Sequence, residues 1–196
     1  MIMQILITND DGIMAPGLLV LHDIATELAG PHGGVWIVAP QSEQSGVGHC
    51  ISYTKPVLVH QYGPKKYAVE GSPADCVLAG LNDLLPKKPD LVLSGVNKGN
   101  NAAENTLYSG TIGAAIEGAL AGIPSIALSQ FYGPRNIDLE NGFESSATFG
   151  AAAVQACLEA GFKRAHDYAL FYNLNFPPVP AADVLGVRAV SQGYRG

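Results

Sequence analysis

Two adjacent carboxylates, Asp10 and Asp11, follow a short apolar run near the start of the chain, in the order Asn9-Asp10-Asp11-Gly12. Two ionised Asp side chains at this spacing repel each other, and partial burial increases the energetic cost. A divalent cation removes that cost, because hard oxygen ligands suit Mg²⁺, Ca²⁺ or Mn²⁺. The same four residues are also typical of a turn in which Asp11 caps the next helix, so the pair by itself leaves both interpretations open.

Two further polar segments, at residues 40–49 and 94–101, contain groups that can hold an ion. The first offers hydroxyls, amides and a glycine-rich backbone able to approach an anion, although an ordinary crossover loop has the same composition. In the second, Asn oxygens suit Mg²⁺-like ions and Lys98 can meet a phosphate. Three Asn and two Gly in these eight residues also describe a common surface turn.

Ser109 and Thr111 flank Gly110 at the start of a predicted helix. Free backbone N–H groups and hydroxyls at such a position would face a phosphate or another anion. Simple N-capping by Ser109 or Thr111 explains the same residues. His49, beside the segment at 40–49, could assist proton transfer or have a structural role.

The elements that must position these segments alternate between β-branched apolar runs and amphipathic stretches. Strands are expected at residues 5–8, 35–39, 90–94, 124–129 and 168–173, and helices at 18–28, 72–84, 111–121 and 143–160. This order predicts an α/β fold with a doubly wound, Rossmann-like, mostly parallel sheet, which binds ligands at the carboxyl ends of its strands. Residues 51–69 indicate a small β-hairpin insertion, and residues 187–190 a strand with no partner.

Composition narrows the class of protein. The 196 residues predict a single domain with a large core, and the net charge of −6 argues against binding to a nucleic acid polymer or an anionic membrane. An apolar content of 47% with only 14% charged residues leaves room for an oligomer interface. Three cysteines without CxxC spacing fit buried thiols in a reducing cytoplasm. The N-terminal apolar run is too short for a membrane span and lacks the pattern of a signal peptide.

Other enzyme and nucleotide-binding classes lack their motifs in this sequence. The sequence has no GxSxG elbow, no P-loop and no GxGxxG after a strand. A receiver-type switch also places paired acids after its first strand, but residues 39–41 and 94–96 supply no phosphoacceptor Asp. A protein that holds a nucleotide diphosphate through Asp-x-Asp is disfavoured because that spacing is missing.

Taken together, the segments resemble the survival protein SurE family. The motifs that carry this resemblance occur in order: residues 5–12 with Pro16-Gly17, Val38-Ala39-Pro40 with Ser45 and Gly48-His49, residues 71–76, residues 94–97 with Gly99 and Asn101, residues 108–111, residues 173–177 and Gln192-Gly193. The resemblance covers nearly the whole chain. It implies a metal-dependent 5′-nucleotidase acting on nucleoside monophosphates, with other phosphoesters or polyphosphate as further substrates. A non-enzymatic, metal-dependent nucleotide- or phosphate-binding regulatory domain is the alternative.

The resemblance also implies roles for individual residues. One divalent cation, Mg²⁺ or Mn²⁺, would be held by Asp10, Asp11, Ser45 and Asn97, with the two acids as the catalytic residues. The phosphate would be held by Asn101, Ser109, Gly110 and Thr111. Attack by metal-activated water is preferred over covalent attack by Asp10, because that side chain would already be bound to the metal.

The sequence departs from the family in two places. Chains of the family are typically longer and carry a C-terminal arm used in exchange between subunits, whereas this sequence ends just after Gln192-Gly193. We therefore expect a homodimer or homotetramer whose oligomerisation arm is incomplete. Ser72 stands where the family has Thr, and this keeps a hydroxyl at the position.

Overall fold

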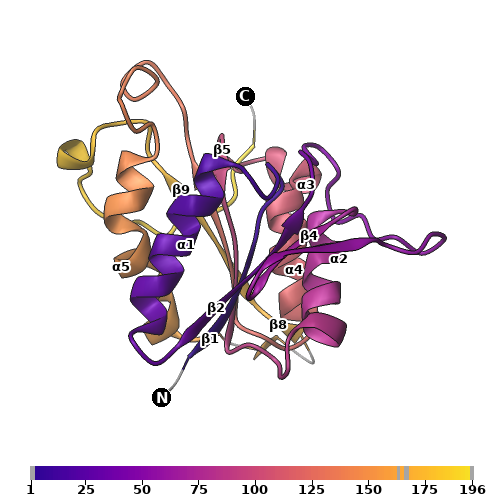
Figure 1. Cartoon of the computed structure of the whole chain (residues 1–196). Helices are drawn as coiled ribbons and strands as arrows, with labels where there is room; N and C mark the ends of the chain where they lie inside the picture. Colours follow the sequence, from indigo (N-terminus) through magenta and orange to yellow (C-terminus); the bar gives the residue numbers. More distant parts are fainter. Residues whose placement is uncertain (1–2, 163, 166–167, 195–196) are drawn as a thin grey trace.

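A seven-stranded sheet forms the centre of the computed structural model, which describes residues 3–162, 164–165 and 168–194 (Figure 1). Its strands are β1 (Gln4–Thr8), β2 (Gly34–Pro40), β3 (Val59–Gly63), β4 (Lys66–Val69), β5 (Leu91–Lys98), β6 (Ser125–Gln130) and β9 (Phe171–Phe176), in the spatial order β3-β4-β2-β1-β5-β6-β9. Every neighbouring pair is parallel except β3 and β4. A separate antiparallel pair consists of β7 (Arg164–Ala165) and β8 (Tyr168–Ala169). The predicted mostly parallel sheet is confirmed.

Helices cover both faces of the sheet. They are α1 (Pro16–Ala29), α2 (Pro73–Ala79), α3 (Asn105–Tyr108), α4 (Gly110–Leu120) and α5 (Glu144–Ala160), with a π-helical turn at Gly80–Leu84 and a 3₁₀ turn at Ala181–Asp183. Figure 1 shows α1 beside α5 on one face and α2 beside α4 on the other. This arrangement is the expected doubly wound architecture.

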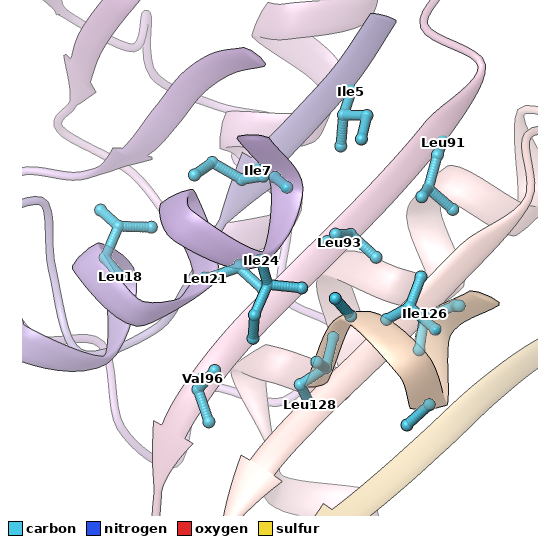
Figure 2. Packing of buried hydrophobic residues seen from close by; sticks show 14 of the residues in the cluster. Ile5, Ile7, Leu18, Leu21, Ile24, Leu91, Leu93, Val96, Ile126 and Leu128 are labelled. Atoms are coloured by element: carbon cyan, nitrogen blue, oxygen red, sulfur yellow. The ribbon is translucent and has the colours of Figure 1, made fainter. Parts of the chain in front are cut away.

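The central strand β1 is buried on both faces because consecutive side chains point in opposite directions. Ile5 and Ile7 pack into the cluster beneath α1 and α5, where Leu21 and Ile24 of α1 meet them (Figure 2). Leu6 packs into the cluster beneath α2 and α4. The unbroken apolar run of β1 is therefore what a strand between two helical layers requires.

The order of the strands creates a switch point at the carboxyl end of β1. From β1 the chain crosses to β2 on one side, and it later returns to place β5 on the other side. Neighbouring connections therefore leave β1 and β5 in opposite directions, and the crevice between them is where open α/β sheets bind ligands. Asp10 and Asp11 follow β1 directly.

The expected hairpin occurs as β3 and β4, and β4 pairs in parallel with β2, so the hairpin extends the sheet. The structure differs from the expectations in two segments. Strand β5 continues to Lys98, beyond the expected end at residue 94. Residues 187–190 form no strand. There the chain is held to the loop before α3 through Gln192, whose backbone and side chain both bond Ala103.

Candidate metal and phosphate site

Asp10 is buried against the first turn of α4. Its Oδ1 accepts a hydrogen bond of 2.6 Å from the Thr111 hydroxyl, and its Oδ2 accepts one of 3.1 Å from the Thr111 backbone N–H. Gly110 permits this close approach, because a Cβ at that position would lie 2.9 Å from the Cβ of Asp10. The positive end of the helix dipole of α4 therefore faces a carboxylate whose orientation is fixed.

Asp11 lies beside the end of β5. Its Oδ2 accepts a hydrogen bond of 3.2 Å from the backbone N–H of Lys98. Burial, and then the neighbouring charges of Asp10 and Glu43, raise the pKa of Asp11 to about 6, against the lowering effect of Lys98. Burial also raises the pKa of Asp10, although the hydrogen bonds from Thr111 act in the opposite direction. The two carboxylates thus lie where ionisation is costly without a compensating cation.

Asn97 is the neighbour of Lys98, whose backbone N–H bonds Asp11, and it lies on β5 because this strand extends further than expected. The pairing of β5 with β6 shifts register between Ser94 and Asn97, and Gly95 lies so close to β6 that a Cβ there would be 2.2 Å from the carbonyl oxygen of Leu128. Beyond this irregularity the Asn97 amide nitrogen donates to the Gly99 carbonyl at 2.9 Å. That bond directs the nitrogen away and leaves the Oδ1 atom as the end that can meet a hard cation.

Ser45 lies on the loop that follows β2. The backbone N–H of Gln44 donates to the carbonyl oxygen of Asp10 at 2.7 Å, which holds this loop against the acid pair. The Ser45 side chain is exposed, and its hydroxyl donates to Glu43 Oε1 at 2.7 Å. Ser45 is therefore next to the contact with Asp10, and its hydroxyl oxygen keeps lone pairs for a cation while its hydrogen is donated to Glu43.

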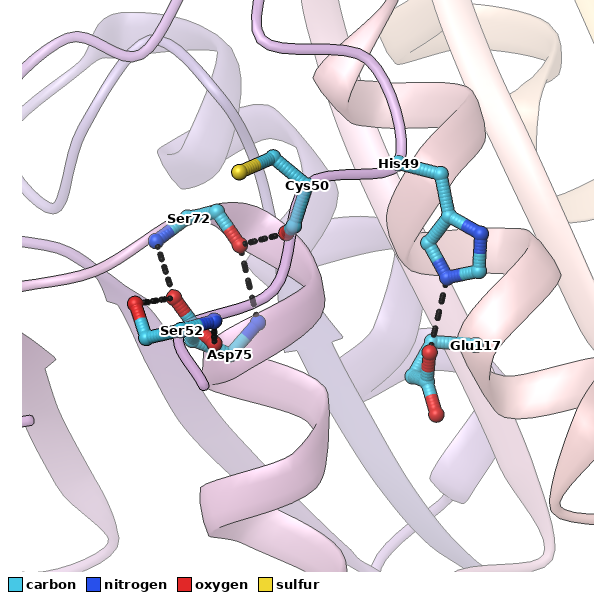
Figure 3. A network of polar contacts seen from close by, with 6 residues as sticks. All are labelled: His49, Cys50, Ser52, Ser72, Asp75 and Glu117. Atoms are coloured by element: carbon cyan, nitrogen blue, oxygen red, sulfur yellow. Dashed lines mark hydrogen bonds and ion pairs between the residues drawn. The ribbon is translucent and has the colours of Figure 1, made fainter. Parts of the chain in front are cut away.

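Two sets of contacts fix the far end of this loop to the helices of one face, and Figure 3 shows both. On α4, Glu117 pairs with His49 Nε2 at 2.7 Å. On α2, Asp75 accepts two hydrogen bonds of 2.8 Å from the backbone N–H and the hydroxyl of Ser52. The Ser72 hydroxyl donates to the Cys50 carbonyl and accepts from the backbone N–H of Asp75, which makes Ser72 the N-cap of α2. The pairing with Glu117 is a structural contact for His49, and a structural role was one of the two that the sequence left open.

Sequence reasoning missed Glu117 and Asp75 as parts of this arrangement. The signal for Asp75 was present, because Ser72 followed three residues later by an acid is the pattern of a capping box. Nothing in the sequence indicated the partner of His49, since the pair joins residues separated by 68 positions.

The expected phosphate-binding residues divide into two groups. Ser109 caps α4 by accepting from the backbone N–H of Ile112 at 3.1 Å, and together with Gly110 and Thr111 it lies at the helix end that faces Asp10. Asn101 is buried elsewhere in the network, where its amide nitrogen donates to the Ser129 hydroxyl at 2.9 Å. The structure thus brings Ser109, Gly110 and Thr111 to the acid pair, and ties the Asn101 amide nitrogen to β6.

The donor chemistry fits a hard divalent cation. Within the described residues, no group of three or more His, Cys, Asp or Glu side chains could hold a metal ion. The acid pair must therefore complete the coordination of such an ion with neutral oxygens, and the Asn97 amide and the Ser45 hydroxyl are the candidates that the motifs supply. Carboxylate, amide and hydroxyl oxygens suit Mg²⁺ or Mn²⁺ and do not favour Zn²⁺.

The fold and the site together define a Rossmann-like α/β protein with a set of oxygen donors beside a helix N-terminus at its switch point. Comparison with known proteins then gives the family. The chain belongs to the survival protein SurE family, whose model matches residues 5–196. The family expected from the motifs is confirmed.

Close relatives support this assignment. A protein of Jannaschia sp. (strain CCS1) named 5′-nucleotidase SurE is 67% identical over 98% of this chain and 74% of its own length. A protein of Roseobacter denitrificans with the same name is 66% identical over the same shares. The crystal structure of the SurE protein from Aquifex aeolicus superposes with a TM-score of 0.84 at 39% identity, over 98% of this chain and 73% of that one.

Proposed function

We propose that this protein hydrolyses nucleoside 5′-monophosphates to a nucleoside and phosphate, in a reaction that depends on one divalent cation. The observation that carries the proposal is the buried pair Asp10 and Asp11 beside the N-terminus of α4, at the switch point of the sheet. The names of the relatives with 66–67% identity, 5′-nucleotidase SurE, support the same reaction class.

In this proposal the cation is Mg²⁺ or Mn²⁺, and its ligands are Asp10, Asp11, Asn97 and Ser45. When bound, such an ion polarises a phosphoryl oxygen and lowers the pKa of a bound water. Thr111 keeps Asp10 in a fixed orientation through its two hydrogen bonds. Because that carboxylate is both held by Thr111 and assigned to the metal, it serves as a ligand and water is the nucleophile.

In this proposal the phosphate binds beside the N-terminus of α4. Ser109 is the N-cap of this helix and Gly110 and Thr111 begin its first turn, and the positive end of the helix dipole there attracts anions. Phosphoryl transfer depends mainly on positioning and charge neutralisation, which this turn and the cation would supply together. Asn101 lies in the segment between β5 and α3, and its bond to Ser129 anchors that segment on β6. In this proposal it contributes to phosphate binding by holding the segment in place.

The wider setting is also a proposal. We infer an enzyme of the reducing cytoplasm, because Cys50, Cys76 and Cys157 are all free thiols. No helix within the described part of the chain has the length and apolarity needed to cross a membrane. Homodimers or homotetramers are proposed from the family resemblance, and the exposed apolar residues Leu185, Val187 and Val190 of the C-terminal segment are consistent with a contact between subunits.

Phosphate release tests the function directly. The purified protein is expected to release phosphate from AMP, GMP, CMP or UMP when Mn²⁺ or Mg²⁺ is present, and a chelator should stop the release. Asp10→Ala and Asp11→Asn should abolish turnover, whereas Asp138→Asn, at an exposed position, should leave it unchanged. No release from any of the four nucleotides would refute the function, and undiminished turnover in the Asp10 or Asp11 variants would refute the site.

A further inference from the structure

A cavity of about 580 Å³ opens beside Asp11 on the face of the sheet that α1 and α5 cover. We call it the α1–α5 cavity. Its wall includes Asp11, the turn that leads into α1, Lys98, Tyr132 and Phe143, which precedes α5. The volume lies within the range of about 300–1,000 Å³ that is typical of small-molecule sites. One wall of this cavity is thus a carboxylate of the proposed metal site.

The two carboxylates face opposite sides of the switch point. Asp10 is bonded to Thr111 at the start of α4, on the face covered by α2 and α4. Asp11 is bonded to the backbone of Lys98 and lines the α1–α5 cavity. A phosphate held at the acid pair, beside the start of α4, would then have space for its leaving group on the side of Asp11. The α1–α5 cavity is the space on that side.

The wall of the cavity combines an aromatic ring with polar groups. The ring of Tyr132 packs edge-to-face on Phe143, with 5.5 Å between centroids, and the ammonium of Lys98 lies 5.3 Å from the Tyr132 centroid. Burial, and then the charge of Asp11, raise the pKa of Tyr132, and the phenol thus lies within electrostatic reach of the acid pair. Gln41, Ser42 and Asn141 add hydrogen-bonding groups. A ligand made of a flat ring and a sugar would fit such a wall, because the ring can pack on Tyr132 and the sugar hydroxyls can bond the polar groups.

We infer that the α1–α5 cavity binds the nucleoside portion of the substrate, with Tyr132 as the side chain against which the base packs. This inference rests on the proposed function, and it adds a specificity-determining residue that the metal and phosphate contacts do not include. Lys98 lies between the metal site and Tyr132, so its ammonium favours a substrate that brings negative charge to the acid pair.

Another cavity competes for the same role. It has about 600 Å³ and lies on the other side of the loop after β2, where Ser52, Ser72 and Asp75 line it together with Glu70. Neither Asp10 nor Asp11 is among its lining residues, nor is any aromatic side chain. It therefore offers neither a link to the acid pair nor a surface for a base. Each of the two cavities is lined by two carboxylates, Asp11 and Glu140 in the α1–α5 cavity, so charge does not separate them.

Substrates of decreasing size test the inference. Turnover with Mn²⁺ is measured for AMP, ribose 5-phosphate and glycerol 3-phosphate in the wild-type protein, Tyr132→Ala and Tyr132→Phe. Loss of a buried aromatic contact worth about 1.4 kcal/mol corresponds to about tenfold in affinity. Tyr132→Ala should therefore raise KM for AMP about tenfold while changing kcat/KM for glycerol 3-phosphate less than twofold, and Tyr132→Phe should stay close to wild type.

A binding measurement separates this inference from the proposed function. Saturation-transfer NMR with adenosine needs no turnover, and the base protons should show transfer with the wild-type protein and lose it with Tyr132→Ala. Tyr62→Ala, at an exposed tyrosine of β3, is the matched control and should behave as wild type.

The outcomes distinguish the two ideas. Equal losses for AMP and glycerol 3-phosphate, or an unchanged KM for AMP, would overturn the assignment of the cavity while leaving the nucleotidase reaction in place. Adenosine transfer that persists in Tyr132→Ala would overturn it as well. Absence of hydrolysis by the wild-type protein would refute the proposed function, and the adenosine experiment would still report on the cavity.

Discussion

Replacing Asp11 by Asn should stabilise the metal-free protein, although it removes a proposed metal ligand. The folded structure raises the pKa of Asp11 from 3.8 to about 6, chiefly through burial and then through the charge of Asp10. Below pH 3.8 the carboxyl is protonated in both the folded and the unfolded chain and has no differential effect. As the pH rises toward 6, the unfolded chain ionises first, so folding stability falls and then stays low above pH 6.

The size of the effect follows from the shift. About two pKa units correspond to at most about 3 kcal/mol at pH 8, and partial exposure of the Asp11 side chain reduces this to about 1–2 kcal/mol. For a chain of this size that is roughly 3–6 °C in melting temperature. Asn keeps an oxygen that can accept from the backbone N–H of Lys98, so the variant removes the charge and preserves the contact.

Thermal unfolding in excess chelator measures the prediction. Asp11→Asn should melt above wild type at pH 8, and the difference should shrink as the pH is lowered to 5. Asp138→Asn removes one exposed carboxylate and should show no such pH-dependent gain. With Mn²⁺ added, the order should reverse, because only the wild-type protein keeps both acids for the ion. An Asp11→Asn variant that melts at or below wild type at pH 8 in chelator would show that the buried charge is not a source of instability.

Three further predictions concern the surroundings of the acid pair. Thr111→Val removes the 2.6 Å bond to Asp10 and should weaken Mn²⁺ binding about 10–100-fold in calorimetric titration, whereas Thr111→Ser should retain most of the affinity. Unchanged binding in Thr111→Val would exclude Thr111 as the residue that orients Asp10. Gly110→Ala places a Cβ 2.9 Å from both Asp10 Cβ and Pro73 Cγ and should lower the free energy of unfolding in urea by about 1–3 kcal/mol. Gly63→Ala, where a Cβ meets nothing within 4 Å, should lower it much less, and equal losses would contradict the close approach. Asp75→Ala leaves the backbone N–H groups of Ser52 and Ser72 without their acceptor and should lower the free energy of unfolding by about 2–4 kcal/mol in the same assay, more than Asp75→Asn does. A loss below about 1 kcal/mol would mean that the capping network contributes little to stability.

The sequence predicted the parts of the fold that depend on local patterns. The apolar run at 5–8 and the helix that Ser72 begins are set by residues close in the chain, and both occur as expected. The end of β5 could not be predicted in the same way. Asn97, Lys98 and Gly99 have turn-like composition, but pairing with β6 at Asn97 and Lys98 keeps the strand extended. Such pairing depends on a neighbour more than 30 residues away.

In the C-terminal segment, by contrast, the sequence predicted a strand that the structure does not contain. Val187 and Val190 have high β-propensity, yet a strand requires a partner for its backbone groups, and the described part of the chain provides none there. For the site, sequence motifs indicated which residues to expect, and the structure added their mutual orientation. The bonds from Thr111 to Asp10 and from Lys98 to Asp11 join segments 101 and 87 positions apart, beyond the reach of any local pattern.

The contrast between Asn97 and Ser45 has a consequence for how the proposed metal site could be altered. Asn97 belongs to a strand whose place is set by the whole sheet, and Asp10 is held by Thr111 at the start of α4. Ser45 lies on an exposed loop, where its hydroxyl donates its hydrogen to Glu43 and keeps its oxygen lone pairs. The carboxylate of Glu43 therefore makes the Ser45 oxygen a better donor for a cation. Substitutions of Glu43 on the surface would then change that one proposed ligand and leave the groups held by the core as they are.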